Sequence, residues 1–293
     1  MDYFTIKQQF YTGNYEEVLK EVAKFNKTED ETLVYYKNRA LMALSQFSEG
    51  CADTGTLGPV FEAYYQFLGK PSGSISALET AVEGAGRSPF ALNLLVSALT
   101  IQGELDTALD VAVEGIDSDE SQGTAELLLT AIQVTLLNNQ PSVATTMFEN
   151  FQALQESSNE DEIILNLAES YINFNQGKEI TGSNFYFYEE LSQSFPSWKT
   201  QLGLLNLHLQ QTNLPEAKTI IDMLQDEFYD SKQESQIYKP DLLASEITYT
   251  ILSGGNASEL RSQLQQLKPS HPLCINNIEN NKSFDQIVEK YSA

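Results

Sequence analysis

Histidine and cysteine, the side chains that most often bind metals or act as nucleophiles, are scarce in this chain. Its 293 residues include two histidines and two cysteines. His208 falls at a packing position of a predicted helix, and His271 lies at a helix end, so we interpret both as structural. Cys51 and Cys274 are far apart and lack metal-site spacing, which fits a reducing compartment without a disulfide framework. We expect no metal site and no cofactor.

Other motifs that could carry chemistry are incomplete. Gly69-Lys70 is followed by proline and lacks the upstream glycine of a phosphate-binding loop, and no G-x-S-x-G elbow occurs. The acidic run Glu160-Asp161-Glu162 opens a predicted helix, where carboxylates favour the positive end of the helix dipole. Trp198, the sole tryptophan, is interpreted as a packing residue between repeats. The sequence therefore predicts that the chain is not an enzyme.

The charge of the chain is strongly negative. Acidic residues number 41 against 17 basic ones, for a net charge of −24. Such a chain repels nucleic-acid phosphates and anionic lipid headgroups, so we expect no nucleic acid and membrane contact only through a partner. The N-terminus lacks the pattern of a signal peptide, and no run approaches the ~20 apolar residues of a membrane span. We expect a cytoplasmic protein whose partner is basic.

A short pattern recurs along the chain: a small residue, a gap, a bulky residue, two further positions, then alanine or a near substitute. Copies begin at Gly13, Gly103, Asn139, Thr212 and, more weakly, Gly255. Each copy ends one helical apolar pattern and begins another. This is the turn and second helix of a tetratricopeptide-type repeat, a unit of roughly 34 residues that must stack on its neighbours to bury its apolar face.

The repeats predict an all-α fold, a tetratricopeptide-like helical-repeat solenoid wound as a right-handed superhelix and spanning residues 1–293 as one domain. Residues 1–88 are less regular: seven of the sixteen glycines lie in the stretch 50–86, where helices are expected at Val60–Leu68 and Ile75–Ala85. Residues 89–272 hold clear helix pairs. Residues 273–293 are expected to cap the open end, because Phe284 to Tyr291 recur at helical spacing.

The first helix of each pair is expected to line the concave face of the solenoid. Counting from packing residues gives the positions that would face the groove, where exposed Leu and Ile would form a protein-binding patch. The predicted partner-binding residues are Phe90, Asn93, Ser97, Leu129, Gln133, Leu136, Leu165, Glu169, Ile172, Leu202, Asn206 and Leu209.

Both ends of the chain resemble one known family. The N-terminal likeness lies in Phe10-Tyr-Thr-Gly-Asn-Tyr15, and the C-terminal one in Leu264-Gln-Gln-Leu-Lys-Pro-Ser-His-Pro272 followed by Ser283-Phe-Asp-Gln-Ile-Val-Glu-Lys-Tyr291. These segments resemble the epsilon-COP family, the epsilon subunits of the COPI coatomer. The likeness covers nearly the whole chain and is weakest between residues 50 and 87.

This resemblance implies a non-enzymatic coat subunit without catalytic residues. It further implies binding to the C-terminal domain of alpha-COP within coatomer, transport from Golgi to endoplasmic reticulum, and a peripheral place on Golgi membranes and COPI-coated vesicles through the coat. From the residues alone, the repeats indicate a scaffold that binds a protein.

Two alternatives stay open at this point. A co-chaperone or adaptor module would bind a peptide in its concave groove, and a carboxylate clamp there needs Lys, Arg and Asn from first helices. The first helices offer mostly Glu, Gln and Ser, as at Glu126, Gln133 and Glu169. An enzyme on an all-α scaffold would need clustered acid–base residues, and none is visible.

Overall fold

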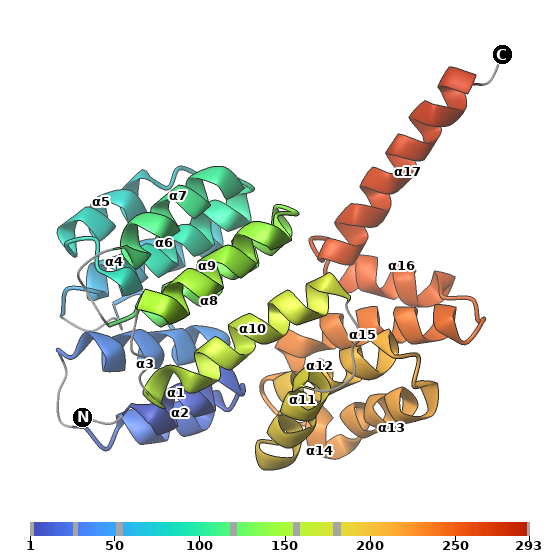
Figure 1. The fold of residues 1–293 in the computed structure, drawn as a ribbon, viewed down its shortest axis with the longest axis horizontal. Helices are drawn as coiled ribbons and strands as arrows, with labels where there is room; N and C mark the ends of the chain where they lie inside the picture. Colours follow the sequence, from blue (N-terminus) through green and yellow to red (C-terminus); the bar gives the residue numbers. More distant parts are fainter. Residues whose placement is uncertain are drawn as a thin grey trace. The chain divides into compact units, whose positions relative to one another are not determined.

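The chain is built of helices. A computed structural model describes residues 3–25, 29–50, 55–117, 122–154, 159–177 and 183–291, and within these ranges no strand occurs. The all-α helical-repeat fold predicted from the sequence is confirmed. The helices cluster into two compact units, Met1–Glu179 (unit 1) and Ile180–Ala293 (unit 2) (Figure 1). A single solenoid domain over 1–293, divided after residues 88 and 272, stays a prediction.

Unit 1 contains ten α-helices and one short 3-10 turn among its described residues. They are α1 Phe4–Tyr11, α2 Tyr15–Val22, α3 Glu31–Ala43, α4 Gly58–Gly69, α5 Ser76–Gly84, α6 Pro89–Gln102, α7 Leu105–Ile116, α8 Thr124–Leu137, α9 Pro141–Leu154, η1 Asn159–Asp161 and α10 Glu162–Gln176.

The predicted repeat turns form where the recurring pattern begins. Gly103 follows α6 with φ 84°, and the non-glycine residues Asn139 and Thr212 adopt φ 56° and 59° at their own turns. A left-handed residue reverses the chain within one or two positions after a helix, which lets the next helix pack back against it. The turn motif therefore marks real helix–helix corners, including one at a β-branched threonine.

Small residues allow the helices of unit 1 to pack closely. Ala108, Ala112 and Ala144 are completely buried where second helices meet their neighbours. At Gly115 on α7, an added Cβ would lie 2.5 Å from Leu127 Cδ2 and 2.6 Å from Leu92 Cδ1. This close approach joins α7 to the first helices of its own pair and the next one.

The glycine-rich stretch of residues 50–86 contains the two helices that the sequence predicted. They are α4 and α5, each within two residues of its expected bounds, and they pack against each other and against α6. Residues 51–54 of this stretch, including Cys51, lie outside the described part. The described glycines interrupt helices at their ends and leave the α4–α5 pair stacked on the repeats.

The N-terminal helices of unit 1 contact the first helices of later repeats. Helix α1 packs on η1 and on α10, beside the first turns of α10 in Figure 1, and α3 packs on α6. The aromatic rings of Phe10, Tyr11, Tyr35 and Tyr36 meet edge to face in this region, with ring centroids 5.1 to 6.2 Å apart. Such aromatic pairs add to the burial of a core.

Unit 2 contains the remaining helices. They are α11 Ser183–Ser194, α12 Trp198–Gln210, α13 Leu214–Gln225, the short α14 Glu227–Asp230, α15 Ser235–Leu252, α16 Ser258–Leu267 and α17 Pro272–Tyr291. The larger core cluster centres on Trp198, Leu205 and Leu224. A second, smaller cluster joins Ile247, Ala257, Leu264 and Cys274.

Helix α17 contains the apolar residues of the predicted cap. Its first turn contributes Cys274 to the smaller cluster, and the helix then runs away from α16 (Figure 1). Phe284, Ile287, Val288 and Tyr291 are 65%, 57%, 45% and 74% exposed. These four side chains are largely exposed in this structure, and the first turn of α17 is seated on the smaller cluster; the cap over residues 273–293 stays a prediction.

Candidate partner-binding surface

The two histidines occupy structural positions, as the sequence predicted. His208 is buried and packs edge to face on Phe185, with ring centroids 5.3 Å apart, and burial lowers the pKa of His208 below its ordinary value. The Nδ1 atom of His271 accepts a hydrogen bond from the backbone N–H of Leu273 at the start of α17, and its Nε2 lies 3.2 Å from Asp241 Oδ1. Neither ring faces a catalytic partner.

The acidic residues that precede and open α10 were predicted to interact with the helix dipole, and in the structure Glu160 and Asp161 also make hydrogen bonds to the N-terminal helices. Glu160 Oε1 accepts a 3.2 Å hydrogen bond from the backbone N–H of Tyr3, and Asp161 Oδ1 accepts a 2.5 Å bond from Lys7 Nζ. These carboxylates attach α1 to η1, directly before α10. Within the described ranges, no group of three or more His, Cys, Asp or Glu is placed to hold a metal, and no helix is long and apolar enough to cross a membrane.

Most of the predicted groove residues are buried. Leu136 is half-buried. The other apolar members are between 1% and 7% exposed; they are Phe90, Leu129, Leu165, Ile172, Leu202 and Leu209. Asn93 is also buried. The expectation that Leu and Ile form an exposed patch on this face is therefore wrong for these positions. Whether a partner uses the face stays a prediction.

On the first helix of unit 1 repeats, burial depends on position along the helix. On α6, Phe90 and Asn93 are buried while Ser97, one turn further along, is half-buried. On α8, Leu129 is buried, but Gln133 is exposed. The predicted groove residues are therefore buried near the N-terminal ends of α6 and α8, and those further along each of these helices reach solvent.

The chain's own helix α3 supplies part of this cover. The Tyr35 ring lies against the Phe90 ring, with centroids 4.6 Å apart, and the Tyr35 hydroxyl donates a 3.1 Å hydrogen bond to Asn93 Oδ1. The Asn93 amide nitrogen donates in turn to the backbone carbonyl of Glu126 and to Thr130 Oγ1. The polar groove residue Asn93 is thus fully engaged inside unit 1.

A buried charged group lies beside this contact. Lys7 Nζ of α1 is 3.1 Å from Glu126 Oε1 and 2.5 Å from Asp161 Oδ1, and the Tyr36 hydroxyl of α3 donates a 2.6 Å hydrogen bond to the same Glu126 oxygen. Burial by itself lowers the pKa of Lys7, but the two carboxylates outweigh burial and raise that pKa above its ordinary value. Burial, reinforced by Glu126, raises the pKa of Tyr36 well above its ordinary value.

Sequence reasoning did not identify these cover residues. Lys7, Tyr35 and Tyr36 carry no local motif, and their partners lie far along the chain, 90 residues away for Tyr36 and Glu126. The only available signal was indirect: a glutamate at the inward-facing position 126 of an otherwise apolar helix requires a cation or donors nearby.

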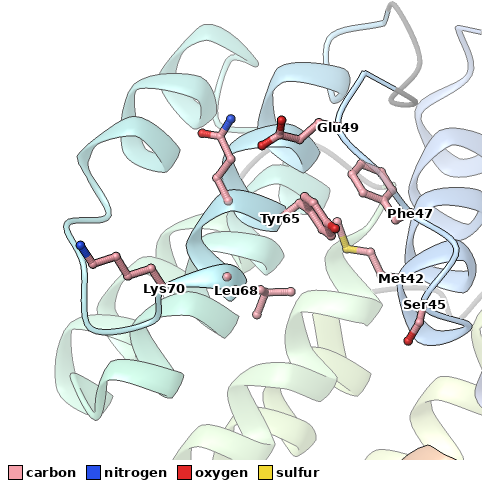
Figure 2. A pocket seen from close by; sticks show the side chains of 9 residues that line it. Met42, Ser45, Phe47, Glu49, Tyr65, Leu68 and Lys70 are labelled. Atoms are coloured by element: carbon pink, nitrogen blue, oxygen red, sulfur yellow. The ribbon is translucent and has the colours of Figure 1, made fainter.

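The described residues of unit 1 also line hollows outside the groove, two of which follow. One of about 610 Å³ lies between the end of α3 and the end of α4, where Phe47 and Tyr65 approach each other and Lys70 stands at the opposite rim (Figure 2). The other, of about 210 Å³, is mainly apolar and lies between α7 and α9, beside Phe151 and Leu154. The lining of the larger hollow includes Ser45, Glu49 and Lys70, and the smaller one has Asp117 among mainly apolar side chains.

Comparison with known proteins places the chain in a family. The sequence profile of the coatomer epsilon subunit matches residues 2–292. A curated relative, coatomer subunit epsilon of Saccharomyces cerevisiae (strain ATCC 204508 / S288c), is 47% identical over 297 residues, which cover 100% of this chain and 99% of the relative. A solved tetratricopeptide repeat protein from Parabacteroides merdae ATCC 43184 is 15% identical with a TM-score of 0.49, covering 86% of this chain and 98% of that one. The full-length profile match and the curated relative agree, and the chain belongs to the coatomer epsilon subunit family.

Proposed function

We propose that this coat subunit binds the C-terminal domain of alpha-COP and stabilises it within coatomer, in support of transport from Golgi to endoplasmic reticulum. As a family member, the chain is a structural, non-enzymatic component of the COPI coat that works with other coatomer subunits. The observation that supports the finer proposal is the 47% identity to coatomer subunit epsilon over essentially the whole length of both chains.

The proposed docking surface is the part of the predicted groove that solvent reaches. In unit 1 it comprises Gln133 and Leu136 at the end of α8 and Glu169 in the middle of α10. This docking surface is confined to unit 1; in unit 2, the predicted position Asn206 is exposed on α12 between the buried Leu202 and Leu209. The partly exposed, apolar Leu136, together with the polar Gln133 and the acidic Glu169, suits a partner that brings an apolar anchor and basic residues.

The proposed location is the cytoplasm and the outer face of Golgi membranes and COPI-coated vesicles. A net charge of −24 disfavours direct contact with anionic lipid, so the subunit would reach the membrane through the rest of the coat. This supports attachment by a protein partner rather than by lipid.

The co-chaperone alternative has little support from the groove. A carboxylate clamp needs free cationic or amide donors. Asn93 already donates to the Glu126 carbonyl and to Thr130, and Lys7 is held by two carboxylates. These two donors are therefore occupied by the chain itself.

Co-expression with the alpha-COP C-terminal domain tests the proposal. Leu136→Asp places a charge at the open end of the groove, and Leu137→Asp places the same charge one residue along α8, on a side chain that is 59% exposed. We expect recovery of a one-to-one complex with the parent chain and with Leu137→Asp, and a loss of roughly tenfold or more in affinity with Leu136→Asp.

Three outcomes are distinguishable. Absence of any complex with the parent chain would refute the proposed partner. Equal affinity of the two variants would move the docking surface away from the groove, and circular dichroism melting of both variants would show whether Leu136→Asp acts through folding instead.

A further inference from the structure

We infer that α1–α3 form a releasable cover over the groove of unit 1, fastened by Lys7 between Glu126 and Asp161, and that the face beneath accepts a partner segment carrying aromatic and basic side chains. The second half of this inference rests on the proposed function; the first half concerns the isolated chain alone.

The cover is attached at a small number of polar points. Besides the Lys7 contacts, the backbone N–H of Tyr3 donates to Glu160, and the Tyr36 hydroxyl donates to Glu126. Tyr3 is further held by a 2.6 Å hydrogen bond from its hydroxyl to Asp30 Oδ2, next to α3. Together with the Tyr35 hydroxyl bond to Asn93, these contacts join the N-terminal helices to each other, to α6 or to residues 126–161, and we expect the cover to separate as one element.

Buried polar atoms at this contact and within α3 lack hydrogen-bond partners among the described residues. Glu126 is 1% exposed, yet its Oε2 has no hydrogen-bond partner among the described residues. The same holds for both amide atoms of Asn38, a completely buried residue on α3. Unpaired buried polar groups weaken an interface. The α6–α8 core is made of apolar residues such as Leu94, Ala98 and Leu127, all 0% exposed, and Ser88 Oγ at the start of α6 is the unpaired buried atom described there.

The buried charges make release cooperative. If Lys7 leaves, Glu126 stays in a dry environment without a countercharge, and solvent or another cation must replace the ammonium. The contact therefore favours two states, closed and open, over a gradual loosening.

The chemistry of the uncovered face defines what would bind there. With the cover removed, Phe90 offers an aromatic surface, Asn93 loses its hydroxyl donor, and Glu126 loses both its cation and its hydroxyl donor. An occupant that restores these contacts needs an aromatic ring with a hydroxyl or similar donor, and a lysine or arginine at the position of Lys7. The side chains with which the cover contacts this face therefore indicate which side chains a competing partner would need.

Native-state hydrogen exchange on the intact chain tests the cover without any partner. We expect amides of α1 and α3 to exchange through a local opening at denaturant concentrations below those that open α6 and α8. Lys7→Met should accelerate exchange in α1 and α3 at least tenfold, with little change in α7. The matched control Lys20→Met removes an exposed lysine of α2 that pairs only with Glu17 at the surface, and it should leave exchange in α1 and α3 unchanged.

A second variant keeps the test decisive if Lys7→Met unfolds unit 1. Lys7→Met with Glu126→Gln removes both members of the buried pair and should recover folding with an intact or tighter cover. Exchange of α1 and α3 in the parent chain only together with α6 and α8 would overturn the cover, and so would equal behaviour of Lys7→Met and Lys20→Met.

Capture of the alpha-COP C-terminal domain tests the occupant separately. Lys7→Met should increase capture several-fold and Lys20→Met should not. If Leu136→Asp abolishes capture while Lys7→Met leaves it unchanged, the partner does not use the covered face and this half of the inference is wrong. If the parent chain captures nothing, the proposed function fails, and the exchange result stands on its own.

Discussion

The indole Nε1 of Trp198, the first residue of α12, donates a 2.9 Å hydrogen bond to the backbone carbonyl of Tyr229 in α14. The same indole lies edge to face with the Tyr229 ring and parallel to the Tyr238 ring, at 6.1 and 6.5 Å between centroids. Trp198 is 1% exposed. One side chain therefore joins α12, α14 and α15 in the core of unit 2.

Trp198→Phe should destabilise unit 2 by about 2 to 4 kcal/mol. The variant leaves the Tyr229 carbonyl without its buried donor, at about 1–3 kcal/mol, and removes one ring from the largest side chain of the cluster. Denaturant unfolding followed by far-ultraviolet circular dichroism measures the loss. Tyr186→Phe, at a side chain that is 65% exposed on α11, is the control and should change stability by less than about 0.5 kcal/mol. Equal effects of the two variants would contradict the role assigned to Trp198.

Two glycine substitutions in unit 1 should have opposite signs. Gly115→Ala brings a Cβ within 2.6 Å of Leu127 and Leu92, so we expect a loss of about 1–3 kcal/mol from overpacking. Gly84→Ala in α5 meets nothing within 4 Å and should gain about 0.5–1 kcal/mol from the higher helix propensity of alanine. Urea unfolding measures both changes, and an unchanged stability of Gly115→Ala would mean that the Leu127 and Leu92 side chains adjust without cost.

Local chemistry in the sequence predicted the repeat corners and the second helices. Gly103, Asn139 and Thr212 were assigned to turns from their spacing, and all three adopt positive φ. The face of each first helix was also predictable, because Phe90 and Asn93 share one stripe at helical spacing.

What covers that stripe was not predictable. Lys7 meets Asp161 across 154 residues, and Tyr35 meets Asn93 across 58. Pairings at such separations depend on how repeats stack, and a single sequence has no periodic signal for them. The second half of α17 raises a related problem: Phe284 and Val288 show an apolar stripe, but helical spacing cannot tell a stripe packed on its own chain from one left open.

Acid should weaken unit 2 through His208. Burial holds the folded-state pKa of His208 below its ordinary value of about 6.5, so the unfolded chain takes up the proton first. Above the unfolded-state pKa of about 6.5, the neutral ring contributes its full share to stability. That contribution is lost as the pH falls from about 6.5 toward the lower folded-state pKa. Unfolding between pH 7.5 and 5 should show a steeper decline for the parent chain than for His208→Gln. Parallel curves for the two proteins would contradict this prediction.

Two truncations of α17 should separate its seated first turn from its open remainder. Ending the chain at Lys282 removes Phe284, Ile287, Val288 and Tyr291, which are all at least 45% exposed, so the thermal midpoint should stay the same. Ending it at His271 also removes Cys274 from the cluster with Ile247, Ala257 and Leu264, and it should cost about 1 kcal/mol or more.

The same truncations report on what the open stripe of α17 does in solution. Exposed apolar residues in one row favour association, so the chain ending at Lys282 should sediment as a cleaner monomer than the parent at high concentration. If the stripe is open, the chain ending at Lys282 should associate less than the parent chain while its thermal midpoint stays the same. If the chain ending at Lys282 has a thermal midpoint as low as that of the chain ending at His271, the second half of α17 packs on unit 2, and its apolar stripe is a cap.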